Sequence, residues 1–367
     1  MKKSFSLVLL SILAIGSLLF GWYAGQKKEE KVSNTSAPQQ EKEEKTLDID
    51  APQENHKKNS NWENVVSNGE NYVTVRSIQK FYGFNPLRIS GSKIILKSHN
   101  VRVEFLIGQQ DVWMNKIKFV FSFPVKREGD RYLVHRIDLV KLLDPVLRPH
   151  TIALDVDTVI IDPGHGGHDS GTNSPHGHGS EKEHALTVAN KLSTQLRKRG
   201  FKVGLTRSTD KFLSLQQRVD YANQYQNAVF ISLHFNSGGG GRAQGIETFT
   251  LSPKGVADYG RGLKDSDFKE KAGNNNDPAN IALATAIHST VIQNTQRQDR
   301  GIRRARYSVI TGVQHPAILL EGGFLTHHTE GSYIQASDYQ DRLAISIADA
   351  VVKYKYAIKK RTSASLK

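Results

Sequence analysis

Apolar and polar positions divide the chain into stretches with different patterns. An uncharged, largely apolar run occupies residues 5–24 and follows Lys2 and Lys3, which is the pattern of a membrane-targeting segment. About 20 apolar residues are also enough to span a bilayer. Residues 26–60 are rich in Lys, Glu, Gln, Asn and Ser and contain too little apolar surface to fold. We therefore expect residues 1–25 to be a signal peptide or a membrane anchor and residues 26–60 to be a flexible linker.

Two interpretations of residues 1–25 remain open. Signal-peptide cleavage prefers small residues at positions −3 and −1. A cut after Ala24 would place Trp22 at −3, and a cut after Gly25 would place Tyr23 there. This arrangement favours an uncleaved anchor. Both interpretations predict an exported chain.

Residues 61–150 show short apolar–polar alternation interrupted by Gly, Asn and Asp, which predicts strands joined by turns. Two short helices are expected near residues 75–82 and 136–143. This stretch is therefore expected to form a small α+β domain. The predicted strands are 72–75, 93–96, 101–106, 116–121 and 132–134.

Residues 151–356 follow a different pattern, in which strands alternate with helices. Ser180 and Glu183 form a capping-box pattern at the start of one helix, and Ser214 with Gln217 begins another. Such alternation predicts an α/β domain with a mostly parallel sheet and helices on both faces. The predicted strands are 156–161, 201–206, 228–233 and 317–320, and the later helices are 280–293 and 336–354.

The composition narrows the possible chemistry. The 367 residues include no cysteine, so any metal must be held by His, Asp or Glu. The 50 basic and 36 acidic side chains leave a formal charge of +14, which suits a polyanionic environment. That charge alone does not separate nucleic acid, anionic lipid and an acidic envelope polymer. Because an exported chain has little access to DNA, we expect no nucleic-acid partner.

Three predicted strands each place a reactive side chain just beyond the carboxyl end. His165 follows the first strand, His234 the third and Glu321 the last, while Glu181 lies in the first turn of the helix after the His165 loop. Ligands of parallel sheets sit at this edge. Two imidazoles and a carboxylate form a sound zinc shell with a position open for water. Glu321 is then free to act as a general base.

Neighbouring residues offer alternatives to this assignment. Glu183 competes with Glu181 as a ligand, but its capping-box position gives it a structural task. His168, His176 and His178 lie in a loop rich in Gly, Ser and Pro. We expect these three histidines to face solvent or substrate rather than to bind the metal.

Eight segments resemble, in order, the motifs of the zinc-dependent N-acetylmuramoyl-L-alanine amidases of bacterial cell walls. The resemblance covers about residues 156–354 and implies one Zn²⁺ ion held by His165, Glu181 and His234, with Glu321 as the catalytic glutamate. The segments are VIIDPGHGGHDSGT, SEKEHALTVANKL, LTRSTD, LSLQQRVDYAN, VFISLHFNS, GIETF, DRGIRRARYSVI and PAILLEGGFLT.

The resemblance also implies a substrate and further site residues. The substrate is peptidoglycan, cut between the lactyl group of N-acetylmuramic acid and L-alanine of the stem peptide in the bacterial cell envelope. Arg218 and Asn236 occupy motif positions and are expected to bind substrate polar groups or hold loops. An alternative is a non-catalytic peptidoglycan-binding protein on the same fold. Degenerate copies usually lose a metal ligand or the catalytic glutamate, and all four residues are present here.

Other parts of the chain carry weaker signals. The sequence YVTVRSI…FYG in residues 61–150 resembles the amino-terminal module of copper amine oxidases, which implies wall association without copper chemistry. In some amidases an inserted helix plugs the zinc site, but residues 252–280 are polar and are expected to form an ordinary loop. The basic run at residues 303–306 is expected to be a solvated face or to line a groove for carboxylates. Residues 357–367 are expected to be a basic tail.

One departure from the family pattern lies near the last motif. A Ser-Asn pair commonly follows the Gly-Phe of that motif, whereas here Leu325 is followed by Thr326, His327 and His328. The departure affects the expected edge of the substrate groove and leaves the four proposed metal and catalytic residues intact.

Overall fold

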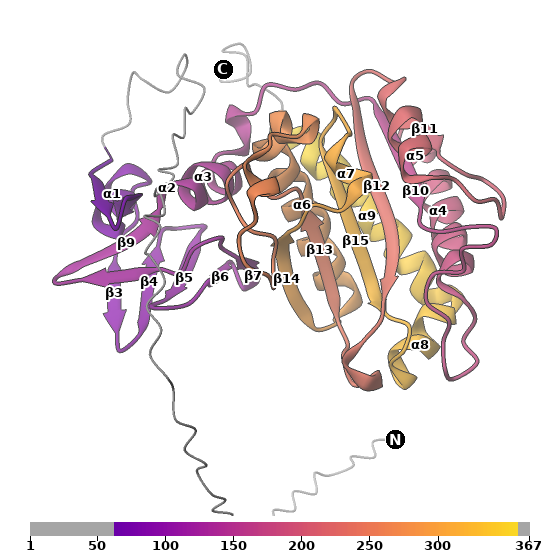
Figure 1. Ribbon diagram of the computed structural model, residues 1–367, viewed down its shortest axis with the longest axis horizontal. Coiled ribbons are helices and arrows are strands. Elements are labelled where there is room, and N and C mark those ends of the chain that lie inside the picture. Colours follow the sequence, from indigo (N-terminus) through magenta and orange to yellow (C-terminus); the bar gives the residue numbers. More distant parts are fainter. Residues whose placement is uncertain (1–61, 359–367) are drawn as a thin grey trace, which may run out of the picture. The chain divides into compact units, whose positions relative to one another are not determined.

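The computed structural model describes residues 62–358, which form two sheets with helices packed against them (Figure 1). Our predictions for residues 1–25, for the linker 26–60 and for nearly all of the basic tail fall outside the described residues. Among residues 62–358, no helix has both the length and the apolar character needed to cross a membrane.

The smaller sheet has four antiparallel strands in the order β1-β2-β9-β8. The first helix, α1, begins where the Thr74 side chain accepts a hydrogen bond from the backbone N–H of Ser77. The short helices expected near 75–82 and 136–143 are both present. The elements are β1 (Asn64–Ser67), β2 (Glu70–Thr74), α1 (Val75–Phe81), β8 (Lys126–Glu128), β9 (Arg131–His135), α2 (Arg136–Asp138), a π-helical turn (Leu139–Leu143) and α3 (Asp144–Leu147).

The larger sheet has eleven strands in the order β11-β10-β12-β15-β13-β14-β7-β6-β5-β4-β3. Strands β10, β11, β12 and β15 are parallel to one another, and β13 is antiparallel to β15. The predicted α/β class with a mostly parallel catalytic sheet is therefore confirmed. The strands are β3 (Leu87–Ser90), β4 (Lys93–Lys97), β5 (Arg102–Leu106), β6 (Asp111–Met114), β7 (Ile117–Val120), β10 (Thr158–Pro163), β11 (Lys202–Leu205), β12 (Ala228–Asn236), β13 (Ile246–Thr250), β14 (Asp299–Arg304) and β15 (Ala317–Phe324).

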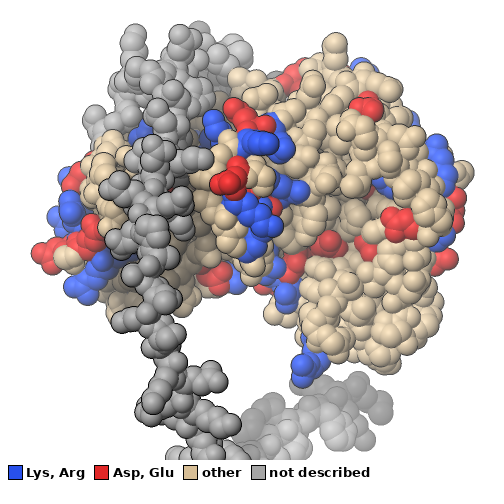
Figure 2. Space-filling view, viewed as in Figure 1, with Lys and Arg blue, Asp and Glu red and all other residues tan. Residues whose placement is uncertain are grey.

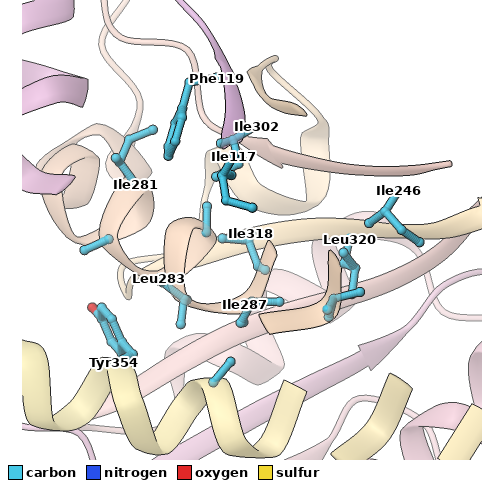
Figure 3. Packing of buried hydrophobic residues seen from close by; sticks show 14 of the residues in the cluster. Ile117, Phe119, Ile246, Ile281, Leu283, Ile287, Ile302, Ile318, Leu320 and Tyr354 are labelled. Carbon is cyan, nitrogen blue, oxygen red and sulfur yellow. The ribbon is translucent and has the colours of Figure 1, made fainter. Parts of the chain in front are cut away.

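Helices cover both faces of the parallel part of this sheet. Val159 of β10 packs in the core formed with α4, α6 and α9, whereas its neighbour Ile160 points into a second core formed with α5 and α7. Figure 3 shows Leu283 of α6, Leu320 of β15 and Tyr354 of α9 within the first core. The helices are α4 (Glu181–Lys198), α5 (Leu215–Asn223), α6 (Asp277–Thr295), α7 (Ser308–Thr311), α8 (His328–Gln335) and α9 (Ser337–Ile358).

The larger sheet continues across the boundary expected at residue 150. Strand β14 of the catalytic part pairs with β7, with Ile302 opposite Phe119. Beside this pair, the backbone N–H of Lys118 donates to Asp299 Oδ2 over 2.8 Å. The two parts therefore share one sheet and one continuous apolar core.

Of the two alternatives for the basic run at residues 303–306, the solvated face is wrong, because Arg303 and Arg304 are buried. Arg303 and Arg304 are buried in β14, where Arg304 Nη1 lies 2.9 Å from Asp138 Oδ1. Arg306 pairs with Asp258 and Asp267 over 2.8 and 3.0 Å. The positive charges are buried because distant acidic partners neutralise them.

The segment between β13 and α6 forms a polar loop, as expected. It contains two 3₁₀ turns, Asp265–Phe268 and Ala272–Asn276, and no α-helix is described within it. Arg261 ties the loop together through ion pairs with Asp258 and Asp267. In Figure 2, basic and acidic side chains gather side by side near the middle of the face shown, where Figure 1 draws this segment.

Candidate metal centre

The loop after β10 places His165 at the carboxyl edge of the sheet. Its backbone has a φ of 60°, in the left-handed region that side-chain-bearing residues rarely occupy. The preceding Gly164 lies against the imidazole of His234, and a Cβ added there would come within 2.3 Å of the ring atom Cε1. A glycine at position 164 therefore allows the two imidazoles to approach each other.

The structure brings His165, Glu181 and His234 together. Oε1 of Glu181 lies 3.1 Å from Nε2 of His165 and 2.8 Å from Nδ1 of His234. The two imidazole rings have centroids 5.0 Å apart and meet edge to face. One ligand atom from each residue lies within 4.8 Å of the others. These three side chains therefore lie close enough to hold a metal ion without any movement.

The two competing glutamates of α4 have different surroundings. Glu183 Oε2 accepts a hydrogen bond from the backbone N–H of Ser180 over 2.9 Å and so caps the helix. Glu181 is buried, and its Oε2 accepts from the Thr172 N–H while Oε1 faces the imidazoles. Burial acts to raise the pKa of Glu181, but the two histidines hold it below its ordinary range.

Asp169 orients the first imidazole. Its Oδ2 lies 2.9 Å from Nδ1 of His165, so a proton on Nδ1 leaves the lone pair of Nε2 free to face Glu181. Gly171 completes the loop with a φ of +62°, and a Cβ there would lie 2.6 Å from both Glu181 Oε2 and His165 Cδ2. Asp169 was not singled out in the sequence, although its position four residues after His165 was a usable signal.

These residues fit a zinc ion. Two imidazoles and one carboxylate are the donors of several catalytic zinc sites, which leave a fourth position open. The partner of His165 Nδ1 is a carboxylate, as in many histidine-metal sites. The glycines at 164 and 171 leave room for the three donors to converge.

Glu321 lies beside this group on the adjacent strand. In the sheet, Glu321 of β15 is opposite His234 of β12 on one side and Glu247 of β13 on the other. Its Oε2 is buried and has no hydrogen-bond partner among the described residues. Burial, followed by the negative charges of Glu181 and Glu247, raises the pKa of Glu321 well above its ordinary value.

Asn236 and its neighbours hold Glu247. Asn236 Nδ2 donates to Glu247 Oε2 over 2.9 Å, and Arg300 and Arg303 lie 2.5 and 2.7 Å from Oε1. The sequence prediction assigned Asn236 to substrate binding or to holding a loop. In the structure its amide binds the carboxylate next to Glu321.

Arg218 is buried beneath the His165 loop. Its guanidinium donates to Asp162 Oδ1 over 2.8 Å, to the Pro163 carbonyl over 2.7 Å and to the His165 carbonyl over 2.7 Å. A second buried arginine, Arg207, donates to the carbonyls of Pro163 and Gly164.

Sequence reasoning missed Arg207. It lies within the motif LTRSTD, but no spacing pattern marked it as a support of the His165 loop.

A cleft opens beside the two imidazoles. It has a volume of about 280 Å³ and is lined by His165 and His234 together with Phe212, Leu213 and Leu215. Phe212 and Leu215 are 44% and 52% exposed, so the cleft has an apolar rim open to solvent. The arrangement combines a candidate metal centre with an apolar rim.

Comparisons with known proteins match this part of the chain. A family model described as N-acetylmuramoyl-L-alanine amidase matches residues 159–353. The uncharacterized protein YqiI of Bacillus subtilis is 34% identical over 198 residues, which cover 54% of this chain and 84% of that protein. The amidase LytC of the same organism is 33% identical over 199 residues, or 54% of this chain and 35% of LytC. The matched segment thus spans about a third of LytC.

A solved structure gives a similar match. The crystal structure of an N-acetylmuramoyl-L-alanine amidase from Clostridium difficile 630 is 34% identical in sequence, with a TM-score of 0.45. The match covers 55% of this chain and 97% of the crystallised chain.

Proposed function

This chain belongs to the N-acetylmuramoyl-L-alanine amidase family, and on that premise we propose that it hydrolyses the amide bond between the lactyl group of N-acetylmuramic acid and L-alanine in peptidoglycan. One structural observation in this chain is the main support for the proposal. His165, Glu181 and His234 converge within 4.8 Å, directly beside the unpartnered carboxylate of Glu321.

The three converging residues are the proposed ligands of one zinc ion. Zinc supplies Lewis acidity, which activates water and polarises a carbonyl group. Nε2 of His165, Nδ1 of His234 and Oε1 of Glu181 face one another and would hold the ion. Asp169 keeps Nε2 of His165 available by accepting a hydrogen bond from Nδ1–H.

Glu321 is the proposed general base and acid. Its carboxylate takes a proton from the attacking water, whose oxygen forms a bond to the amide carbon. The carbon–nitrogen bond then breaks, and the proton passes from Glu321 to the departing nitrogen of L-alanine. Burial raises the pKa of Glu321, so this carboxylate holds a proton more readily than an exposed one, which suits the step that takes the proton from water.

Arg218 and Asn236 have supporting roles in this proposal. Arg218 acts by fixing the carbonyls of Pro163 and His165, so it positions the loop that presents the first imidazole. Asn236 acts on Glu247, which lies opposite Glu321 in the sheet. Both are positioning residues whose hydrogen-bonding groups are directed at the protein.

The proposed substrate also determines where the protein works. Peptidoglycan lies outside the cytoplasmic membrane, so the enzyme must be exported to the bacterial cell envelope. The apolar run near the amino terminus would supply the signal or the membrane anchor. Residues 61–150, joined to the catalytic sheet through β7 and β14, would present the cleft to the wall.

Product analysis tests the proposed reaction. The purified protein is incubated with peptidoglycan alone, with a chelator, and with a chelator followed by excess zinc, and the soluble products are identified by mass spectrometry. We expect stem peptides with a free L-alanine amino terminus, lost with the chelator and restored by zinc. Intact glycopeptides under all three conditions would refute the proposed activity and favour a peptidoglycan-binding protein.

A further inference from the structure

A second group of histidines lies apart from the proposed catalytic metal centre. His176 and His178 belong to the loop between His165 and Glu181, and His328 is the first residue of α8. The His328 ring centroid lies 5.0 Å from that of His176 and 6.0 Å from that of His178, and the remaining pair is 6.2 Å apart. Three imidazoles from two distant parts of the sequence therefore meet where the loop passes α8 (Figure 1).

The spacing of one of the three ring pairs matches imidazoles that share a metal ion, whereas the two pairs that include His178 are wider, at 6.0 and 6.2 Å. With a metal–nitrogen distance of about 2.0–2.1 Å and tetrahedral geometry, the centroids of two ligating rings lie about 5 Å apart. His176 and His328 have centroids 5.0 Å apart with an interplanar angle of 74°. The proposed catalytic pair, His165 and His234, has the same separation and an angle of 79°.

His178 is arranged as a ligand in the same way as His165. Its Nδ1 lies 3.1 Å from Oε1 of Gln335, and in the tautomer that donates from Nδ1 to this oxygen, Nε2 is the unprotonated nitrogen. Nε2 then carries a free lone pair, and this atom is buried without a hydrogen-bond partner in the described chain. A buried, unpaired nitrogen is costly unless a ligand satisfies it.

The backbone of α8 accommodates this ring. A Cβ added to Gly331 would come within 2.8 Å of Cδ2 of His178, so a glycine at this position lets the imidazole pack against the helix. His327, by contrast, accepts the Glu330 N–H at Nδ1 and caps α8. The neighbouring histidines thus have separate tasks.

We propose that His176, His178 and His328 form a second site for a divalent transition-metal ion that prefers imidazole, such as Zn²⁺, Ni²⁺ or Cu²⁺. Their ligand atoms are further apart than those of the His165 group, so binding draws the exposed rings of His176 and His328 inward. The ion ties the loop between His165 and Glu181 to the helix after β15. Without the ion, His176 is exposed, as expected from the sequence, and His178 is half-buried.

Metal stoichiometry tests this proposal independently of amidase activity. The untagged full-length protein is stripped of metal and dialysed against buffered Zn²⁺, and bound zinc per chain is measured by plasma mass spectrometry. We expect two equivalents for the unaltered protein and one for the double variant His176→Asn/His328→Asn. The same loss is expected for His178→Ala. The control His99→Gln, which alters an exposed histidine of the amino-terminal module, keeps two.

A second pair of variants separates this proposal from the proposed function. His165→Ala/His234→Ala removes the catalytic ligands, and we expect it to keep one equivalent and to gain thermal stability on zinc addition. Adding His176→Asn/His328→Asn removes both the remaining ion and that gain. If His176→Asn/His328→Asn binds as much zinc as the unaltered protein, the second site does not exist. If His165→Ala/His234→Ala keeps two equivalents, the catalytic site is wrongly assigned and the second site is unaffected.

Discussion

The glycines of the His165 loop show how single residues make the metal centre possible. Side chains at positions 164 and 171 would occupy the space of His234, Glu181 and His165. Gly171 also has a left-handed backbone, with a φ of +62°, that other residues adopt only at a cost. The motif therefore specifies where side chains are missing as well as which donors are present.

Gly171→Ala tests this point. The added Cβ would lie 2.6 Å from both Glu181 Oε2 and His165 Cδ2, so we expect at least a tenfold loss in zinc affinity and a similar loss in amidase activity. Gly200→Ala is the matched control, because its φ is +84°, also left-handed, and its Cβ would meet no atom within 4 Å. Equal losses in both variants, measured by zinc titration, would attribute the effect to backbone strain alone.

Buried arginines donate hydrogen bonds to the backbone of the His165 loop, and we expect their removal to lower the free energy of unfolding. Arg218→Met leaves the Asp162 carboxylate with hydroxyl partners only, from Thr206 and Ser232. We expect the free energy of unfolding to fall by about 3–5 kcal/mol, as for other broken buried ion pairs. Arg218→Lys should recover little, because one ammonium group cannot reach the same set of acceptors. Urea denaturation of both variants gives the comparison, and a loss below about 1 kcal/mol for Arg218→Met would contradict this account.

At the scale of elements, the sequence correctly predicted features that depend only on neighbouring residues, such as the starts of helices. The capping boxes at Ser180 and Ser214 predicted the starts of α4 and α5. Strand β14 was missed because it contains Arg303 and Arg304, which read as surface residues. Their burial depends on acidic partners far away in the sequence, and no local pattern reveals such pairs.

The ion pair between Arg304 and Asp138 should stabilise the contact between β14 and the amino-terminal module. Both side chains are almost completely buried, so Arg304→Met leaves the Asp138 carboxylate with the backbone N–H groups of Ser122 and Phe123 but no cation, and should cost about 3–5 kcal/mol. Lys202→Met breaks an exposed pair with Asp157 and should cost less than about 1 kcal/mol. Chemical denaturation checks both values, and equal effects would show that the buried pair has no special role.

At the scale of the whole molecule, residues 61–150 and the catalytic part are joined by a sheet and a core that run through both. The sequence predicted two consecutive folding units because the alternation pattern changes near residue 150. It did not reveal that β7 and β14 pair, because parallel pairing between strands separated by about 180 residues leaves no local signal. The His-Glu-His group was easier to predict, since His165 follows a recognisable strand, His234 lies near the end of another and Glu181 begins a helix.

The shared sheet predicts joint unfolding of the described chain. We expect differential scanning calorimetry to show one cooperative transition for both parts, because separating them exposes the edge of β14 and unpairs Arg304. Two transitions, with the catalytic part retaining its melting temperature after deletion of residues 61–150, would contradict this expectation.

The central claim of the proposed mechanism is that three residues bind zinc, whereas Glu321 transfers protons and does not bind the metal. The most direct measurement is made on Glu321→Gln, with bound zinc and the rate of stem-peptide release determined on the same preparation. We predict that the variant keeps its zinc at the catalytic site and loses at least 10³-fold in turnover, because the amide cannot accept a proton from water. Loss of zinc together with activity would make Glu321 a ligand, and retained activity would remove it from the reaction.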